Sequence, residues 1–369
     1  MKKKTAILIV DDSLIFRKAV EESLANENDI EVIGSVRNGI KALEFIEKRR
    51  PDLITLDVEM PELDGLETLA IIQELNAKTP DIFPMGVVMV SAFTHKGADI
   101  TIKALENGAF DFITKPEGKI FDANKDILRR QLVAKIRYFA SRMIASKKKN
   151  SDQGVTIPTH PKLLQKPQPV TIIEKKNQTI KALFIGVSTG GPRALVSMLP
   201  QLCEVTTLPI FIVQHMPPKF TESLAASLDT KCRYTVVEAS ENDIIQDKFV
   251  YIAPGGKHML LRRRGNDIVV VINEQPPEQG CRPSVDVLFR SAVPVYDGDV
   301  IAIILTGMGC DGTKGIRALK RSGAYVIAQD EESSVVWGMP GSAVRSGNVD
   351  EIISLNNIPN AIEKILAKE

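Results

Sequence analysis

Several features that would indicate a specialised class of protein are absent from this sequence of 369 residues. No apolar stretch approaches the roughly 20 residues that a membrane helix needs, so we expect no insertion into a membrane. The formal net charge is only +1, and this balance gives no general attraction to nucleic acid or to an anionic membrane surface. Histidine occurs only four times, so few side chains are candidates for a general base near neutral pH.

Cysteine is also scarce, and its positions match no known motif. The four cysteines are Cys203, Cys232, Cys281 and Cys310. They form no C-x-x-C pair and have no spacing typical of a metal site, so we expect reduced thiols in a reducing compartment. The N-terminus carries lysines and a short apolar run, but that run ends at two aspartates and indicates a buried strand rather than a signal peptide. We predict a cytoplasmic protein and expect a monomer.

The apolar content of 44% is sufficient for two packed cores. In residues 1–140, apolar runs such as "AILIV", "DLITLDV" and "GVVMVSA" alternate with helix-like stretches. A second alternation of this kind occupies residues 180–369 and includes two runs joined at Gly265–Asn266, which predict a β-hairpin. We therefore predict two doubly wound α/β domains, a five-stranded parallel one and a larger, mostly parallel one of hydrolase type.

Between these domains, residues 141–179 are rich in lysine and proline and have no sustained periodicity. Such a composition is typical of a solvated linker, although a helical start or a basic docking segment for an acidic partner is also compatible with it. The segment 181–369 carries 19 basic and 21 acidic residues, a net charge of −2, and has no basic recognition helix. We therefore expect no nucleic-acid partner.

Five polar residues follow the strands predicted in the first domain: Asp11, Asp12, Asp57, Ser91 and Lys115. The carboxyl ends of parallel strands meet at one edge of a sheet, where three carboxylates raise one another's pKa unless a cation lies between them. Oxygen ligands of this kind suit Mg²⁺, and the serine and lysine are suited to a phosphoryl group. The alternative for a single aspartate is a helix cap.

The stretches "VDD", "TLDVEMPELDG", "MVSA" and "FITKP" resemble those of a response-regulator receiver domain. The resemblance implies that a histidine kinase phosphorylates Asp57 and that Asp11, Asp12 and Asp57 hold Mg²⁺. It also implies that Ser91 and Lys115 contact the phosphate and that Phe112 occupies the aromatic switch position.

In the second domain, the turn Gly186–Gly190 has the pattern G-x-S-x-G, with Ser188 at its centre. A Gly-rich turn between a strand and a helix either binds phosphate or exposes a nucleophile. The turn lacks both the Gly-Lys-Ser/Thr ending of a phosphate loop and the dinucleotide G-x-G-x-x-G spacing, which favours the nucleophile.

Two further predicted strands end in His215 and in a turn carrying Asp311. Each residue has a structural alternative. For His215 it is a structural rather than a catalytic role, and for Asp311 it is a cap of the helix that begins near Gly312. Together with Ser188, however, they form the set in which a base removes the hydroxyl proton and an acid orients the base. For the oxyanion we expect the backbone N–H groups near Thr189 and Met308.

The stretches "IGVSTGGP", "QHMP", "RPSVDVLF" and "LTGMGCDG" resemble those of the protein-glutamate methylesterases of bacterial chemotaxis. The resemblance implies a Ser188–His215–Asp311 triad that needs no cofactor, hydrolyses glutamate γ-methyl esters of chemoreceptors and releases methanol. It also implies deamidation of selected receptor glutamines and activation by phosphorylation of the receiver. Arg193 and Arg282 are candidates for contact with the acidic receptor or for structural roles.

Two alternatives remain open from the sequence. Receivers are often joined to DNA-binding modules, and that architecture would make the protein a phosphorylated transcriptional switch. A hydrolase with the same chemistry could also serve another receptor or signalling array, because binding partners, and not the triad, determine which proteins the enzyme acts on.

Overall fold

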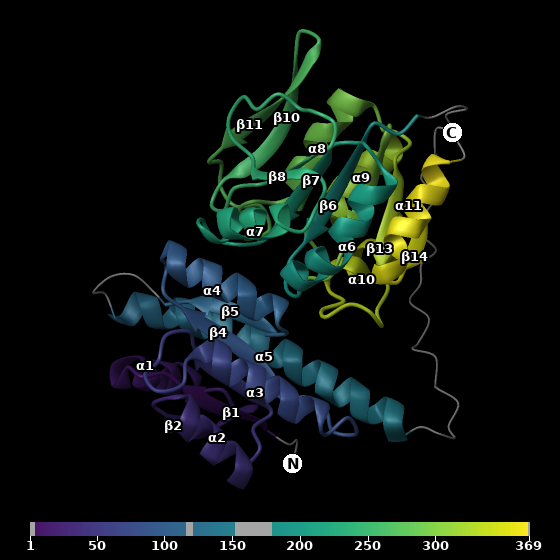
Figure 1. The fold of residues 1–369 in the computed structure, drawn as a ribbon. Coiled ribbons are helices and arrows are strands. Elements are labelled where there is room, and N and C mark those ends of the chain that lie inside the picture. The colour runs from purple at the N-terminus through teal and green to yellow at the C-terminus, as the bar shows by residue number, and fades with distance from the viewer. Residues whose placement is uncertain (1–3, 116–120, 152–178, 368–369) are drawn as a thin grey trace. The chain divides into compact units, whose positions relative to one another are not determined.

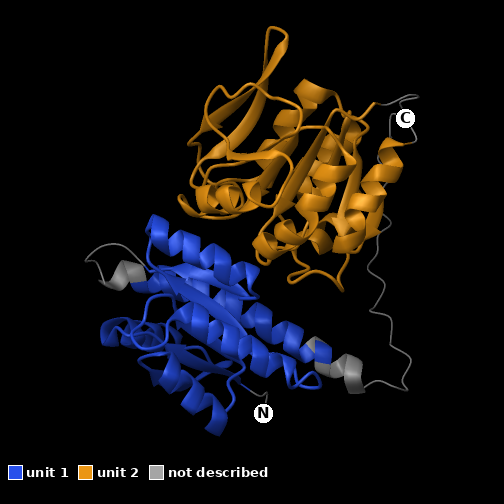
Figure 2. Cartoon of the chain, viewed as in Figure 1, with its two compact units in different colours: residues 1–162 blue, residues 163–369 orange. Residues whose placement is uncertain are grey.

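The computed structural model describes residues 4–115, 121–151 and 179–367, and it divides the chain into two compact units, residues 1–162 and 163–369 (Figures 1 and 2). Most of the predicted linker, residues 152–178, lies outside the described residues. None of the helices in the described ranges combines the length and the apolar character needed to cross a membrane.

The first unit contains a five-stranded parallel sheet in the order β2-β1-β3-β4-β5. Its elements are β1 (Thr5–Val10), α1 (Leu14–Leu24), β2 (Ile30–Val36), α2 (Gly39–Lys48), β3 (Leu53–Asp57), α3 (Gly65–Ala77), β4 (Gly86–Ser91), α4 (His95–Glu106), β5 (Asp111–Thr114) and α5 (Phe121–Ser151). Strands β3 and β4 are fully buried along their length, as expected for a sheet covered on both faces. The fold predicted for this domain is confirmed.

Helices cover both faces of this sheet: α1 packs with α5, while α3 packs with both α2 and α4. Side chains define where these helices begin. Asp64 accepts a hydrogen bond from the backbone of Glu67, whose side chain accepts one in return, and this capping box starts α3. Helix α5 ends at Ser151, inside the segment predicted as a linker, because residues 141–151 contain neither proline nor glycine and favour helix.

The second unit contains a seven-stranded parallel sheet in the order β14-β13-β12-β6-β7-β9-β8. Its elements are β6 (Ala182–Val187), α6 (Gly191–Val205), β7 (Ile210–Gln214), α7 (Phe220–Asp229), β8 (Thr235–Glu238), β9 (Phe249–Ile252), β10 (His258–Arg264), β11 (Asp267–Asn273), α8 (Val285–Tyr296), β12 (Val300–Ile304), α9 (Thr313–Arg321), β13 (Tyr325–Gln329), α10 (Met339–Arg345), β14 (Glu351–Ile353), the 3₁₀ helix η1 (Leu355–Asn357) and α11 (Ile358–Leu366). The predicted mostly parallel domain is confirmed.

Strand β6 lies at the centre of this sheet, and the chain continues to β7 on one side while β12 occupies the other. The order of the strands reverses at this point, and in open α/β sheets ligands bind beyond the carboxyl ends of the strands at such a position. An aromatic cluster fixes β6: the ring of Phe184 stacks on Phe211 at 4.9 Å and meets the edges of Phe289 and Tyr296. The centre of the sheet is therefore closely packed by aromatic rings.

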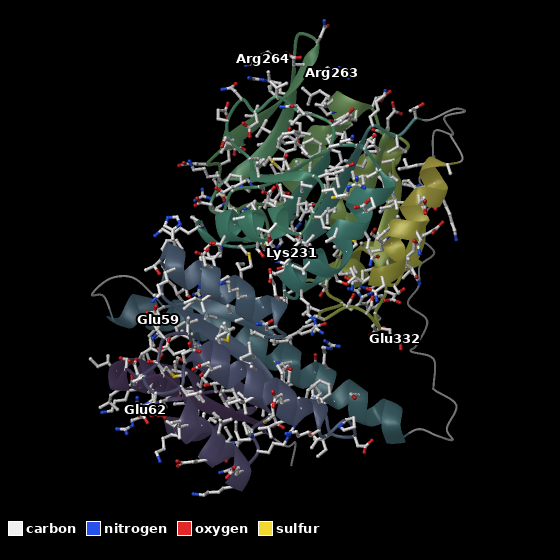
Figure 3. All side chains as sticks on the ribbon, in the orientation of Figure 1. Glu59, Glu62, Lys231, Arg263, Arg264 and Glu332 are labelled. Carbon is white, nitrogen blue, oxygen red and sulfur yellow. The ribbon has the colours of Figure 1, made fainter. Side chains whose placement is uncertain are left out.

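Strands β10 and β11 form the predicted antiparallel hairpin, which packs through β10 on α8. Gly265 at the turn has a φ of 63°, a conformation that glycine adopts without strain. Arg263 and Arg264 lie at the tip of this hairpin (Figure 3).

Candidate functional site

In the receiver-like unit, the structure brings the predicted strand-end residues to one edge of the sheet. Lys115 follows β5, and its Nζ lies 2.8 Å from Asp57 Oδ2 and 2.9 Å from Asp11 Oδ2. Asp11 and Asp57 are buried, whereas Asp12 is exposed. A cavity of about 230 Å³ beside them is lined by Asp12, Asp57, Val58, Glu59, Ala92, Gly97 and Lys115.

Burial and neighbouring charges shift the pKa values of both Asp57 and Lys115 at this edge. Burial, and then the neighbouring Asp11 charge, raise the pKa of Asp57 to about 6, although the Lys115 hydrogen bond opposes the rise. Burial lowers the pKa of Lys115, but its hydrogen bonds to Asp57 and Asp11 outweigh burial and leave that pKa above the ordinary value. The lysine is therefore charged at neutral pH.

Three aspartates at this edge fit a hard cation. One carboxylate oxygen from each of Asp11, Asp12 and Asp57 lies within 4.8 Å of the others, and an all-oxygen set is the one that Mg²⁺ prefers. Ser91, at the end of β4, is fully buried and donates to the carbonyl of Gly97.

In the second unit, the strand β6 delivers Ser188 to a sharp turn before helix α6. The backbone N–H of Ser188 donates to Thr306 O at 2.9 Å, and Gly190 adopts a φ of 79°. A Cβ atom at Gly307 would lie 2.7 Å from Ser188 Cβ, so the loop after β12 approaches the serine as closely as glycine permits. The half-buried Ser188 thus stands at the start of a helix.

The register between strands β6 and β7 places His215 beside this turn. Val187 of β6 pairs with Gln214 of β7, and Ser188 and His215 are the next residues of the two strands. The backbone N–H of His215 donates to Val187 O at 3.1 Å. The Gln214 side chain donates to the carbonyl oxygens of Ser188 (3.0 Å) and His215 (3.4 Å), which ties the two strand ends together.

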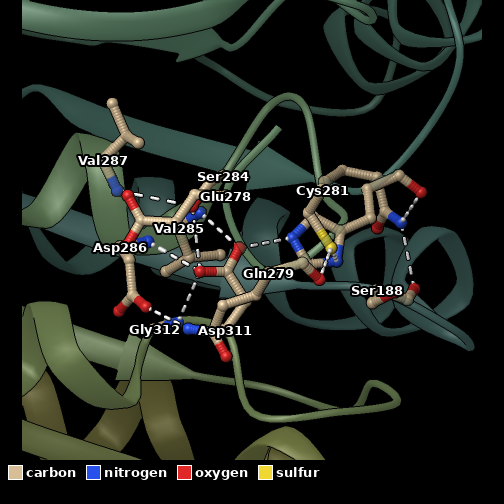
Figure 4. Close-up of polar contacts among 12 residues, drawn as sticks. Ser188, Glu278, Gln279, Cys281, Ser284, Val285, Asp286, Val287, Asp311 and Gly312 are labelled. Carbon is tan, nitrogen blue, oxygen red and sulfur yellow. Dashed lines mark hydrogen bonds and ion pairs between the residues drawn. The ribbon is translucent and has the colours of Figure 1, made fainter. Parts of the chain in front are cut away.

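Asp311 reaches the same edge from the loop after β12. Its Oδ2 lies 2.8 Å from His215 Nε2, and the imidazole is 13% exposed while the carboxylate is 2% exposed. Three donors at the start of α8 also bond the carboxylate: Ser284 Oγ and the backbone N–H groups of Val285 and Asp286 (Figure 4). An anion at a helix N-terminus is stabilised by these donors and by the helix dipole.

The alternative role of Asp311, a cap for the helix that follows it, is wrong. The N-cap residue of α9 is Gly312, and the side chain that accepts from the first turn of this helix is that of Asp286, which bonds Gly315 N–H. The carboxylate accepts from Gly312 N–H but is directed mainly to the imidazole and to α8.

The imidazole and the carboxylate form a mutually charged pair. Burial lowers the pKa of His215, but the hydrogen bonds to Asp311 and Cys281 outweigh burial and raise it to about 9. Burial raises the pKa of Asp311, but the His215 hydrogen bond and charge and the α8 N–H groups hold it below the ordinary value. Asp311 is therefore ionised throughout the neutral range and stabilises an imidazolium.

The other imidazole nitrogen faces Cys281 rather than Ser188. Cys281 Sγ lies 3.7 Å from His215 Nδ1, and within the described parts of the chain the Ser188 hydroxyl makes no hydrogen bond to His215. Because Nε2 is committed to Asp311, Nδ1 is the nitrogen that remains to accept a proton. Catalytic contacts of this kind are often long in the absence of substrate and tighten in the reacting complex.

Comparisons with known proteins show the family of this chain. The profile of the family described as CheB methylesterase matches residues 183–362, and that of the response regulator receiver domain matches residues 7–123. A protein-glutamate methylesterase/protein-glutamine glutaminase of Desulfotalea psychrophila is 43% identical over 98% of each chain. The enzyme of the same name from Trichodesmium erythraeum is 41% identical over 97% of this chain and 98% of its own.

The chain belongs to the protein-glutamate methylesterase/protein-glutamine glutaminase family. Its second unit is also similar to the crystal structure of the Thermotoga maritima CheB methylesterase catalytic domain, at 41% identity and a TM-score of 0.49, over 51% of this chain and 99% of that one. Membership of the family excludes the DNA-binding output domain that the receiver alone left open.

Within this family member, the remaining predicted residues have definite positions. Met308 is half-buried directly after Gly307, and no hydrogen bond engages its backbone N–H among the residues that the structure describes. Thr189 is buried, and its carbonyl accepts from Thr306 Oγ1. Arg282 donates to the carbonyls of the loop at residues 274–275, a structural contact, whereas Arg193 is exposed on α6.

Phe112 lies on β5 and is buried. Three residues of the site were missed by sequence reasoning: Gln214, Ser284 and Cys281. All three lie within the quoted motifs or next to them, but no local pattern indicates that their side chains meet the triad.

Proposed function

We propose that this protein is a phosphorylation-activated hydrolase that demethylates glutamate γ-methyl esters of chemoreceptors and deamidates selected receptor glutamines. The observation that carries the proposal is the 2.8 Å contact between His215 and the buried Asp311, at the strand ends that also deliver Ser188. The names of the relatives, protein-glutamate methylesterase/protein-glutamine glutaminase, supply the substrate class.

In the proposed mechanism, Ser188 Oγ attacks the γ-carbonyl carbon of the ester while His215 Nδ1 accepts the hydroxyl proton. The C–O bond to the methoxy group then breaks, and the imidazolium returns the proton to give methanol. Water attacks the resulting glutamyl-enzyme by the same route and releases the free glutamate side chain. For a glutamine substrate the leaving group is ammonia, and all other steps are unchanged.

Each remaining group of the triad region has one task in this mechanism. Asp311 fixes the tautomer with the proton on Nε2 and stabilises the imidazolium, as its buried ionised carboxylate allows. The backbone N–H groups of Thr189 and Met308 would hold the oxyanion, where one such donor contributes about 3 kcal/mol. No cofactor takes part in these steps.

For the receiver we propose that Asp57 accepts a phosphoryl group from a chemotaxis histidine kinase, with Asp11, Asp12 and Asp57 holding Mg²⁺. The ion supplies charge neutralisation of the phosphoryl oxygens when bound. Lys115, already 2.8 Å from Asp57, would pair with the phosphate, Ser91 would donate its hydroxyl, and Phe112 would report the change. A coupling of about 1–3 kcal/mol between the two domains would change hydrolysis roughly 5–150-fold.

Location and assembly complete the proposal. We place the protein in the cytoplasm as a monomer, with no nucleic-acid partner, and all four cysteines are free thiols, as a reducing compartment favours. The receptors would be its substrates and the kinase its phosphodonor.

The test is methanol release from methylated receptor fragments, with and without a small phosphodonor. We expect release by the unaltered protein to rise with the phosphodonor. Ser188→Ala should release none while still incorporating phosphate at Asp57, and Asp57→Asn should retain unstimulated release only. Full methanol release from Ser188→Ala would remove the serine from the mechanism.

A further inference from the structure

Cys281 is held against the imidazole by a tight turn of the backbone. Glu278 and Cys281 exchange both of their backbone hydrogen bonds, at 3.1 and 2.9 Å. The two residues between them, Gln279 and Gly280, have φ values of 51° and 80°. Positive φ at both central positions is the geometry that closes a two-residue turn, so the thiol has a position fixed by the main chain.

The distance between the thiol and the imidazole matches two ligands of one metal ion. Cys281 Sγ and His215 Nδ1 lie 3.7 Å apart. A tetrahedral zinc ion, with bonds of about 2.3 Å to sulfur and about 2.0 Å to nitrogen, holds two such donors roughly 3.6 Å apart. The separation of the two donor atoms is therefore already close to that of two ligands on one zinc ion.

The other side of the imidazole completes a metal-binding arrangement. His215 Nε2 lies 2.8 Å from Asp311 Oδ2, and histidines that bind metals usually donate their second N–H to a carboxylate in this way. That contact keeps one proton on Nε2, so Nδ1, which faces Cys281, carries the lone pair when the imidazole is neutral. Donor atoms of His215, Cys281 and Asp311 all lie within 4.8 Å of one another.

We propose that Cys281 Sγ and His215 Nδ1 bind a divalent zinc ion and that the bound ion inhibits the hydrolase. The inhibition rests on the proposed function, because the ion occupies the nitrogen that accepts the Ser188 proton. A thiolate and an imidazole select Zn²⁺ over Mg²⁺, whereas the three aspartates of the receiver select the reverse. With two protein ligands and water in the remaining positions, the ion is exchangeable and acts as a regulator.

The activity test uses the full-length protein in excess Mg²⁺, which occupies the oxygen-only site. Zinc is titrated, and methanol release by each variant is divided by its own release without zinc. At zinc about tenfold above the dissociation constant, release by the unaltered protein should fall to about a tenth and return when a chelator is added. Cys281→Ser should need more zinc for the same loss, because a hydroxyl replaces the soft thiolate ligand.

The matched control is Cys310→Ser, because Cys310 is an exposed thiol that bonds Gln279 of the same turn but lies outside the three-residue cluster. We expect this variant to be inhibited as the unaltered protein is. Equal zinc sensitivity of Cys281→Ser and the unaltered protein would overturn the proposal, and so would loss of sensitivity in Cys310→Ser alone.

Direct binding separates this proposal from the mechanism of hydrolysis. Cobalt(II), used in place of zinc, should give a thiolate-to-metal absorption band with the unaltered protein and with the inactive Ser188→Ala, and no band with Cys281→Ser or His215→Ala. A band that persists in Cys281→Ser would overturn the metal site. Methanol release by Ser188→Ala would instead overturn the proposed function and leave the band unchanged.

Discussion

Replacing Asp311 by asparagine removes the negative charge of this side chain and keeps its shape. The carboxylate accepts from His215 Nε2 on one side and from Ser284 Oγ and the N–H groups of Val285 and Asp286 on the other. An amide has only one oxygen. In either orientation its NH₂ group meets a donor, so at least one buried N–H loses its partner or the imidazole changes tautomer.

The two consequences have different magnitudes. One unpaired buried donor lowers the free energy of unfolding by about 1–3 kcal/mol, which leaves a domain of this size folded. If the amide donates to Nε2, the proton of the imidazole moves to Nδ1, the nitrogen that must act as the base. In a hydrolase of the same triad chemistry this error of tautomer lowers kcat by about 10⁴, and we expect a loss of that order for Asp311→Asn.

The assay is methanol release from a methylated receptor fragment, measured with a urea unfolding curve for the same preparation. Asp286→Asn is the matched control, since it removes the neighbouring buried carboxylate, which bonds Gly315 N–H and does not contact the imidazole. We expect it to retain far more activity than Asp311→Asn. If folded Asp311→Asn keeps more than about a tenth of the activity, Asp311 does not control the tautomer of the base.

Three further outcomes follow from the structure. Because the pKa of His215 is about 9 and only the neutral imidazole accepts a proton, kcat/KM should rise about tenfold per pH unit below that value; a profile flat from pH 6 to 9 would contradict this assignment. Because the pKa of Asp57 is about 6 in the site without an ion, the affinity of the three aspartates for Mg²⁺ should fall as the pH drops below 6, and Lys115→Ala should move this fall to higher pH; an unchanged pH dependence would show that the lysine does not lower that pKa. Phe184→Ala should lower the free energy of unfolding of the second unit by about 3–5 kcal/mol in a urea titration, because the ring is fully buried in an aromatic cluster; a loss under 1 kcal/mol would mean that the cluster repacks.

Much of the fold was predictable because both sheets are parallel and each strand is a short apolar run that ends in turn residues. The same feature made the strand-end residues informative, since parallel strands bring their carboxyl ends to one edge whatever their spacing in the sequence. Asp57 and Lys115 meet for this reason. The pairing of Val187 with Gln214 likewise places Ser188 beside His215.

Other parts of the site depend on tertiary contacts that no local pattern records. Asp311 is held by the N-terminus of α8. Strand β12 lies between this helix and Asp311 in the sequence, and only the folded domain brings the two together. Cys281 reaches the imidazole through the turn at Gln279 and Gly280, whose positive φ at a non-glycine residue is not indicated by the sequence. The composition of residues 141–151 indicated a linker, but helix propensity there continues α5 to Ser151.

The most direct measurement is mass spectrometry of the intact protein after rapid mixing with a methylated receptor peptide and acid quenching. We expect an added mass equal to the peptide without methanol, located by digestion on the segment that contains Ser188 and absent from Ser188→Ala. The same adduct on another residue, or its persistence in that variant at full yield, would contradict nucleophilic attack by this serine.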